Sequence, residues 1–177
     1  MDKFPLIYSE RLILRQLSPL DIVDFLQYVN NRKITDRILN FPYPFEEYHA
    51  VFRLKYVYQG FQERTRYIFA IIYRPDESEK FAGEISLHLR EKMRSAELGY
   101  WVAESFWNLG IATEAVAAIV SFGMETLQLQ SIYAECNRDN PASHTVLIKN
   151  HFSQQGHDSE IVRYILESAN EFDSKKK

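Results

Sequence analysis

The stretch Glu97–Ala115 constrains the fold most, because it has the pattern of a strand, a short loop and a long helix. The strand is expected over Ala96–Val102, and apolar residues then recur at helical spacing along one face. That face contains Ala112, Ala115, Val116, Ile119, Gly123 and Met124. The first N–H groups of a helix have no partner within it, and the helix dipole adds positive potential there. Small residues at Gly110 and Ala112 leave this backbone accessible, so the segment predicts an anion site, although Gly110 by itself equally suits a simple tight turn.

The rest of the chain alternates strands and helices. The Tyr67–Tyr73 segment is apolar almost throughout, which is typical of a central strand, whereas the 84–89 strand alternates and has a polar face. Further strands are expected at 12–15, 131–136 and 161–166, with helices starting at Ser18, about Phe45 and Asn140. The helix from Phe45 is expected to reach Tyr58 and stop at Gly60. This order predicts an α/β (α+β) chain with a mixed sheet and helices on both faces.

Composition narrows the possible functions. The chain has 177 residues without repeats or linkers, so we expect one domain over 1–177, with its core at about 9–166. A formal charge of −3 and a pI near 6 argue against nucleic acid as a partner. The single cysteine, Cys136, excludes an internal disulfide and fits a cytoplasmic protein. No apolar run is long enough to span a membrane, and His88, His144 and His151 lack metal-ligand spacing, so we expect neither a membrane partner nor a metal.

Several motifs resemble one known family. The run from Trp107 to Thr113 resembles the acetyl-CoA signature of the GNAT superfamily, Arg/Gln-x-x-Gly-x-Gly/Ala, with Trp107, Gly110 and Ala112 at its marked positions. The segment Ser9–Arg15 is similar to the opening strand of the branch that contains the ribosomal-protein-alanine N-acetyltransferases. The helix start Asn140-Pro141-Ala142-Ser143 resembles that of the same branch, and Lys149-Asn150-His151-Phe152 stands where Lys-Leu-Gly-Phe is usual. The resemblance extends from about Ser9 to Leu166.

This resemblance implies a GNAT-like acyl-CoA N-acyltransferase fold, with a mostly antiparallel sheet and acetyl-CoA as co-substrate. Pantetheine is expected beside the 100–102 strand, and the pyrophosphate on the N–H groups from Trp107 to Thr113. The implied cofactor-binding residues are Tyr100, Trp101, Val102, Trp107, Asn108, Leu109, Gly110, Ile111, Ala112, Thr113 and Asn140. Two residues depart from the branch pattern. Asn108 replaces a frequent glycine but tolerates unusual backbone angles, whereas His151 replaces the glycine before Phe152 and is expected to distort the turn.

Such transferases attack the thioester directly with a free amine, so the resemblance also implies a base and an acid. Glu97 is the first candidate base and Glu84 the second, although Glu97 equally suits a surface ion pair. Because Leu147 stands where many relatives carry tyrosine, either Ser143 is the candidate acid or the thiolate is simply released. A first-turn serine often bonds only to backbone. Asn140 is interpreted first as a helix cap.

The acceptor is expected to be a primary amine, either a protein N-terminus or a small amine such as a polyamine, amino sugar or antibiotic. The aromatics Phe41, Tyr43 and Phe45 either contact it or pack in the core. The protein is expected to be a monomer or homodimer. A catalytically silent acyl-CoA-binding sensor is the alternative, motivated by Leu147 and His151. A nucleotide-binding domain is disfavoured, because the chain lacks both the spaced dinucleotide glycines and the phosphate-loop Gly-Lys-Ser/Thr.

Overall fold

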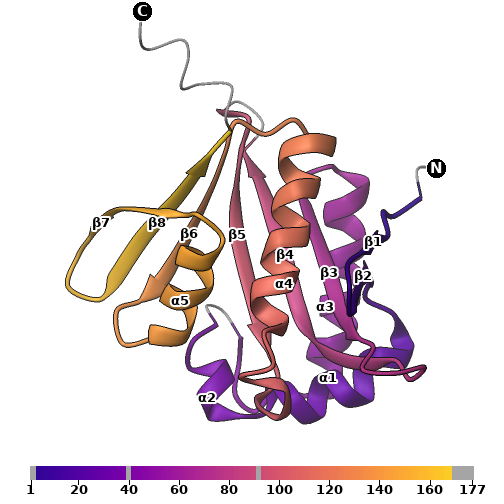
Figure 1. Cartoon of the computed structure of the whole chain (residues 1–177). Coiled ribbons are helices and arrows are strands. Elements are labelled where there is room, and N and C mark those ends of the chain that lie inside the picture. The colour runs from indigo at the N-terminus through magenta and orange to yellow at the C-terminus, as the bar shows by residue number, and fades with distance from the viewer. Residues whose placement is uncertain (1–2, 39–40, 91–92, 169–177) are drawn as a thin grey trace, which may run out of the picture.

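A central eight-stranded sheet organises the protein (Figure 1), as seen in a computed structural model that describes residues 3–38, 41–90 and 93–168. The strands run in the order β1-β2-β3-β4-β5-β6-β8-β7. Their bounds are β1 Ile7–Tyr8, β2 Leu12–Gln16, β3 Arg66–Tyr73, β4 Lys80–Arg90, β5 Ser95–Val102, β6 Ser131–Asn137, β7 Ser153–His157 and β8 Ile161–Glu167. Every neighbouring pair is antiparallel except β5 and β6, which are parallel. The predicted mixed, mostly antiparallel sheet is confirmed.

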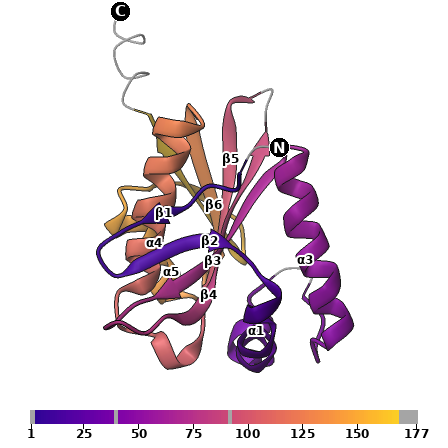
Figure 2. The same ribbon diagram turned by 90° about the vertical axis from the view of Figure 1, so that its right-hand side faces the viewer.

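Helices cover both faces of the sheet, as predicted. Their bounds are α1 Ile22–Val29, α2 Arg32–Thr35, α3 Glu47–Gln62, α4 Ile111–Ser121 and α5 Pro141–Lys149. Figure 2 shows α4 and α5 on one side of the sheet and α1 and α3 on the other. Apolar side chains from both layers meet the sheet. The fully buried ones include Phe25, Phe69, Ile71, Ile85, Leu87, Ile119 and Ile132. Each such burial stabilises the fold by about 1.5–3 kcal/mol.

Strands β5 and β6 are paired along only part of their length and then separate (Figure 1). Their pairing consists of Ser95 with Ser131, Ala96 with Ile132 and Glu97 with Tyr133, so the last five residues of β5 extend beyond it. Strand β6 instead continues in its pairing with β8 as far as Asn137. The split leaves one backbone edge of β5 facing a gap in the middle of the sheet.

Gly60 does not end its helix, contrary to the sequence prediction. Helix α3 continues through it to Gln62. A Cβ at Gly60 would lie 2.1 Å from Cγ of Arg66, so the glycine makes room for the arginine stem that packs across the helix. Because Gly60 has no side chain, it allows close packing here, and the helix tolerates the low helix propensity of glycine.

His151 does not distort the turn after α5, contrary to expectation. It adopts φ = 64°, the left-handed conformation that glycine usually takes after a helix. The N–H of Phe152 donates to the carbonyl of Leu147 at 3.1 Å, and the N–H of His151 donates to the carbonyl of Ile148 at 3.0 Å. These two bonds form a Schellman motif, so the chain turns into β7 in the way a glycine would allow.

Candidate active site

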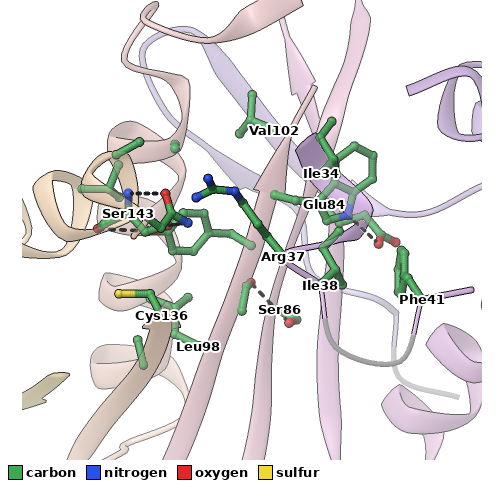
Figure 3. A pocket seen from close by; sticks show the side chains of 18 of the residues that line it. Ile34, Arg37, Ile38, Phe41, Glu84, Ser86, Leu98, Val102, Cys136 and Ser143 are labelled. Carbon is green, nitrogen blue, oxygen red and sulfur yellow. Dashed lines mark hydrogen bonds between the residues drawn. The ribbon is translucent and has the colours of Figure 1, made fainter. Parts of the chain in front are cut away.

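A cleft of about 1740 Å³ opens where β5 and β6 separate (Figure 3). Strands β4, β5 and β6, the loop before α4, and helices α2, α3 and α5 all contribute to its walls. Pockets for one drug-sized ligand usually measure about 300–1,000 Å³. The cleft therefore has room for two reactants that enter from different sides.

Two left-handed residues shape the loop that leads into α4. Asn108 has φ = 63° and Gly110 has φ = 78°, which confirms that Asn108 tolerates an unusual backbone conformation. Gly110 is the N-cap residue of α4 and has no side chain with which to cap the helix. The N–H groups of Ile111, Ala112 and Thr113 thus lack intrahelical partners. The loop has the open donors that an anion site requires.

An ion pair between distant parts of the chain braces this loop. Nε and Nη2 of Arg11 both lie 2.8 Å from Oε2 of Glu114, and Nη1 of Arg11 donates to the carbonyl of Leu109 at 2.9 Å. The Ser9 hydroxyl and the Arg11 N–H each donate to Oε1 of Glu114 at 2.7 Å. Burial by itself would raise the pKa of Glu114, but these hydrogen bonds outweigh it and lower the pKa. No local pattern in the sequence indicates this brace.

Removing the brace is expected to weaken acetyl-CoA binding. Replacing Glu114 with alanine removes the acceptor of four donor contacts and frees Arg11 from Leu109, so the loop loses its fixed shape. Loss of a charged hydrogen bond of this kind corresponds to roughly a tenfold increase in Kd, measured by calorimetry. Glu125→Ala, which removes an exposed glutamate after the same helix, is the control. An unchanged Kd in folded Glu114→Ala protein would show that the loop keeps its shape without the brace.

Three predicted cofactor residues also make hydrogen bonds within the protein. The N–H of Trp107 donates to the carbonyl of Glu104 at 3.1 Å and is unavailable to a phosphate, while its indole Nε1 donates to the Val102 carbonyl at 2.6 Å. Leu109 is absent from the cleft lining, and its carbonyl is held by Arg11. The Trp101 indole is buried and donates to Glu84. Trp101 and Trp107 nevertheless line the cleft, as do the remaining predicted cofactor residues: Tyr100, Val102, Asn108, Gly110, Ile111, Ala112, Thr113 and Asn140.

The backbone edge of β5 faces the gap at alternate residues. The Ala103 N–H donates to the Ala82 carbonyl, and in an antiparallel pair the residues bonded to the neighbour alternate with those directed away. Trp101 therefore directs its N–H and C=O groups to β4, whereas Tyr100 and Val102 direct theirs to the split. The Tyr100 N–H is thus a donor on the open edge of the strand.

Glu97 lies where the two strands separate, at the last residue pair between β5 and β6. Its Oε2 accepts a hydrogen bond of 3.2 Å from the Tyr133 hydroxyl. Burial and the nearby Glu97 carboxylate raise the pKa of Tyr133 to about 12, so this hydroxyl remains a donor. His88 is directly opposite Glu97 on β4, and both side chains line the cleft. Burial, together with the charges of Arg53 and Arg66, lowers the pKa of His88 and favours its neutral form.

Glu84 is held in a buried ion pair. Its side chain is 2% exposed, and it accepts from Nη2 of Arg53 at 2.9 Å, Nε of Arg53 at 3.3 Å and Nε1 of Trp101 at 3.2 Å. Three donors occupy this carboxylate, which makes it a poorer candidate base than Glu97. The site thus contains Glu84, which forms a structural ion pair, and Glu97, which lies where β5 and β6 separate.

The start of α5 forms the opposite wall. Oδ1 of Asn140 accepts from the Ser143 N–H at 3.3 Å, which confirms Asn140 as the helix cap. Nδ2 of Asn140 donates to Oγ of Ser143 at 3.1 Å, and the Tyr100 hydroxyl donates to the Ser143 carbonyl at 3.4 Å. Burial raises the pKa of Tyr100 to about 12. Leu147 is 1% exposed and belongs to the core, so the position that carries tyrosine in many relatives places no hydroxyl here.

The aromatic residues before α3 have separate roles. Phe45 is buried against Phe25 with ring centroids 5.4 Å apart, whereas Phe41 is only partly buried beside the cleft. Tyr43 is exposed, with the guanidinium carbon of Arg32 4.0 Å from its ring centroid. Packing therefore accounts for Phe45, and Phe41 is the aromatic residue best placed to meet an acceptor.

Cys136 lines the cleft, and its thiol is expected to react slowly. Burial raises the pKa of Cys136 to about 11, and Sγ lies 3.4 Å from Nδ1 of His144. Only the thiolate is an efficient nucleophile, so alkylation by iodoacetamide at pH 8 should be about two orders of magnitude slower than that of a free cysteine. The rate should rise roughly tenfold per pH unit towards pH 11, as followed by mass spectrometry. Alkylation at the rate of a free thiol would show that the residue is not shielded.

Within the described ranges, no cluster of three or more His, Cys, Asp or Glu side chains has the geometry to hold a metal ion. No helix among the same residues is both long and apolar enough to cross a membrane.

Comparison with known proteins agrees with this geometry. Residues 11–153 match the family described as "Acetyltransferase (GNAT) domain". The chain is 30% identical over 158 residues to the uncharacterized N-acetyltransferase YoaA of Bacillus subtilis, covering 86% of this chain and 85% of that protein. It is 32% identical over 87 residues to the ribosomal-protein-serine acetyltransferase of Escherichia coli, covering 49% and 47%.

Solved structures share the fold. RimL, a ribosomal L7/L12 alpha-N-protein acetyltransferase in complex with coenzyme A, superposes with a TM-score of 0.82 at 20% identity, over 92% of this chain and 98% of that chain. The microcin C7 self-immunity acetyltransferase MccE, in complex with acetyl-CoA and AMP, superposes with a TM-score of 0.80 at 17% identity, over 90% and 94%. The matched domain covers most of the sequence, and the chain therefore belongs to the GNAT family of acetyltransferases.

Proposed function

We propose that this acetyltransferase uses acetyl-CoA to acetylate a primary amine, and that its acceptor is the N-terminus of a protein or peptide. The observation that carries the proposal is the split between β5 and β6, which joins the loop at Gly110 to Glu97 through one continuous cleft. An amine acetyltransferase needs these elements together: an anion site, a free strand edge and a base.

The residues present fit acetyl-CoA. Bare N–H groups at the start of α4 suit a pyrophosphate, because helix N-termini attract anions. The open β5 edge at Tyr100 and Val102 offers hydrogen bonds to an extended amide chain such as pantetheine. When bound, acetyl-CoA supplies an acetyl thioester, and the chain's own residues position the amine and move its protons.

Glu97 is the proposed base. Its carboxylate takes a proton from the acceptor ammonium, directly or through one water, so that the amine nitrogen has a free electron pair. As the nitrogen–carbon bond forms and the carbon–sulfur bond breaks, negative charge develops first on the carbonyl oxygen. The Tyr100 N–H on the open strand edge is a fixed donor for this charge, and such preorganised donors contribute strongly in acyl transfer.

Ser143 is the proposed acid. Its hydroxyl oxygen accepts from Asn140, which leaves the hydroxyl hydrogen free to be donated to the departing thiolate. Leu147 contributes no competing donor, because its side chain has no polar hydrogen. Ser143→Ala protein that retained full turnover would show that the thiolate leaves without protonation by this residue.

Several features favour a peptide as acceptor. The relatives include enzymes named for ribosomal proteins. The acceptor half of the cleft is bordered by α3, where Phe52 is 66% exposed and Tyr56 is 42% exposed. Exposed aromatic side chains beside a cleft provide contact area for the residues that follow an N-terminus. A small amine would leave these contacts unused.

Two measurements test the proposal in sequence. Calorimetry with acetyl-CoA, with NAD and ATP as controls, is expected to give selective binding in the micromolar range. Thiol release is then measured with unblocked peptides, their N-terminally blocked counterparts, and small amines including a polyamine and an amino sugar. Faster turnover with unblocked peptides supports the proposal, whereas faster turnover with small amines would overturn the peptide acceptor. Acetyl-CoA binding without turnover on any amine would instead support a catalytically silent sensor.

A further inference from the structure

Arg37 is an uncommitted cation in the acceptor half of the cleft. It follows α2 and lines the cleft. Figure 3 shows its side chain extending across the pocket, with the guanidinium nitrogen atoms on the side of Ser143. Among the residues that the structure describes, the guanidinium forms neither a hydrogen bond nor an ion pair. The main-chain N–H of Arg37 donates to the Ile34 carbonyl.

The charged groups around Arg37 are mostly neutralised by their own partners. The pairs are Arg53 with Glu84, Lys33 with Glu104, Arg32 with Asp36, and Arg163 with Glu135. Glu97 remains as the carboxylate that accepts from Tyr133. Among the described residues, the lining thus offers no second unpaired carboxylate to compensate Arg37. Lys55 and Lys149 also line the cleft without an ion pair there, so positive charge is available to a ligand.

We propose that Arg37 binds a carboxylate of the acceptor and selects amines that carry an anionic group close to the reacting nitrogen. In a peptide this group would be an aspartate or glutamate side chain within the first two residues. The inference rests on the proposed function, because it assumes that the acceptor amine reaches Glu97 from the α2–α3 side. A planar guanidinium with several fixed donors suits a carboxylate better than it suits any neutral group.

The same charge disfavours the opposite class of acceptor. A polyamine would place additional ammonium groups beside Arg37, with only Glu97 to compensate them. A carboxylate-bearing amine instead presents a negative group to Arg37 and its ammonium to Glu97. Arg37 and Glu97 then match the two charges of the acceptor, which also sets the direction in which the acceptor lies.

The test compares matched acceptors on matched variants. One peptide pair begins Ser-Asp and Ser-Asn with the same following residues, and a small-molecule pair consists of the α-amides of aspartate and asparagine, which differ only in the side-chain carboxylate. Thiol release gives kcat/KM for each acceptor with the wild type, Arg37→Gln, Arg37→Glu and the control Arg32→Gln. Arg32 begins the short helix α2, which precedes Arg37, and lies outside the cleft lining, so its replacement removes an equal charge elsewhere. Calorimetry with acetyl-CoA verifies that each variant retains the other half of the site.

The wild type and Arg32→Gln are expected to favour the Asp peptide by about tenfold or more, the size expected for a charge-assisted contact. Arg37→Gln should remove the preference, and Arg37→Glu should reverse it. Equal rates for both peptides in the wild type would overturn the Arg37 inference and leave the peptide acceptor standing. If only the small-molecule pair reacts and its preference depends on Arg37, the inference holds and the peptide acceptor fails. A preference for the acidic acceptor that persists in Arg37→Gln would also overturn the inference.

Discussion

Replacing Glu97 with glutamine is expected to lower kcat/KM for amine acetylation by about 10²–10⁴-fold, the usual contribution of a positioned general base. Glutamine has nearly the same shape and still accepts a hydrogen bond from Tyr133, so the change removes the proton acceptor and little else. Affinity for acetyl-CoA should remain unchanged, because the N–H groups that begin α4 are contributed by a different part of the cleft.

Two controls separate catalysis from structure in this experiment. Tyr133→Phe removes the hydroxyl that contacts Glu97 and is expected to change the rate far less than Glu97→Gln does. Calorimetry with acetyl-CoA on Glu97→Gln protein should show that the cofactor half of the cleft is intact, so that a lower rate reports on the chemical step. If Glu97→Gln kept most of the activity, His88 would be the next candidate, since it is neutral, lines the cleft and faces Glu97 across the strand pair.

The elements that the sequence predicted well are those with strong local patterns. The β3 strand is a continuous apolar run and α4 has an apolar stripe, so burial alone determines their type. The loop before α4 was predicted because its open N–H groups follow from the start of any helix that lacks a capping side chain. These features depend on neighbours within a few residues, and a sequence displays them directly.

Elements that depend on distant partners were not predicted. Strand β7, with the sequence SQQGH, has no apolar face, and only its pairing with β8 at the sheet edge makes it a strand. The four-residue helix α2 and the two-residue strand β1 are too short to produce a periodic pattern. Gly60 has the local signature of a helix end, yet packing against Arg66 outweighs it.

The residues of the candidate site also divide into those that a local motif indicates and those that only the fold brings together. Glu97 and Ser143 were identified through motifs, but the split that brings their strands and helix around one cleft appears only in the sheet register. The brace between Arg11 and Glu114 joins residues separated by more than a hundred positions, and no local pattern relates them. Arg37 belongs to a segment without a motif, so its importance depends wholly on where the fold places it.

Replacing Arg53 with methionine is expected to destabilise the fold by about 3–5 kcal/mol, because it leaves Glu84 as a buried charge without its cation. Glu84 is 2% exposed and Arg53 17% exposed, so little water can replace the lost contacts. For a chain of this length such a loss corresponds to a Tm lower by about 6–20 °C. Methionine retains much of the apolar stem, which limits the loss from packing alone, although it removes the guanidinium carbon that lies 5.2 Å from the Phe41 ring centroid.

The double variant Arg53→Met, Glu84→Gln shows whether the buried charge is the cause. Glutamine is neutral and its oxygen still accepts from the Trp101 indole, so the double variant should regain most of the stability lost by Arg53→Met. Urea unfolding of the wild type, both single variants and the double variant completes the cycle, and the coupling energy is the deviation from additivity. Equal destabilisation of Arg53→Met and the double variant would mean that Arg53 acts through packing. Recovery would mean that the buried Glu84 carboxylate depends on Arg53 as its partner, which is the structural role that the ion pair gives it.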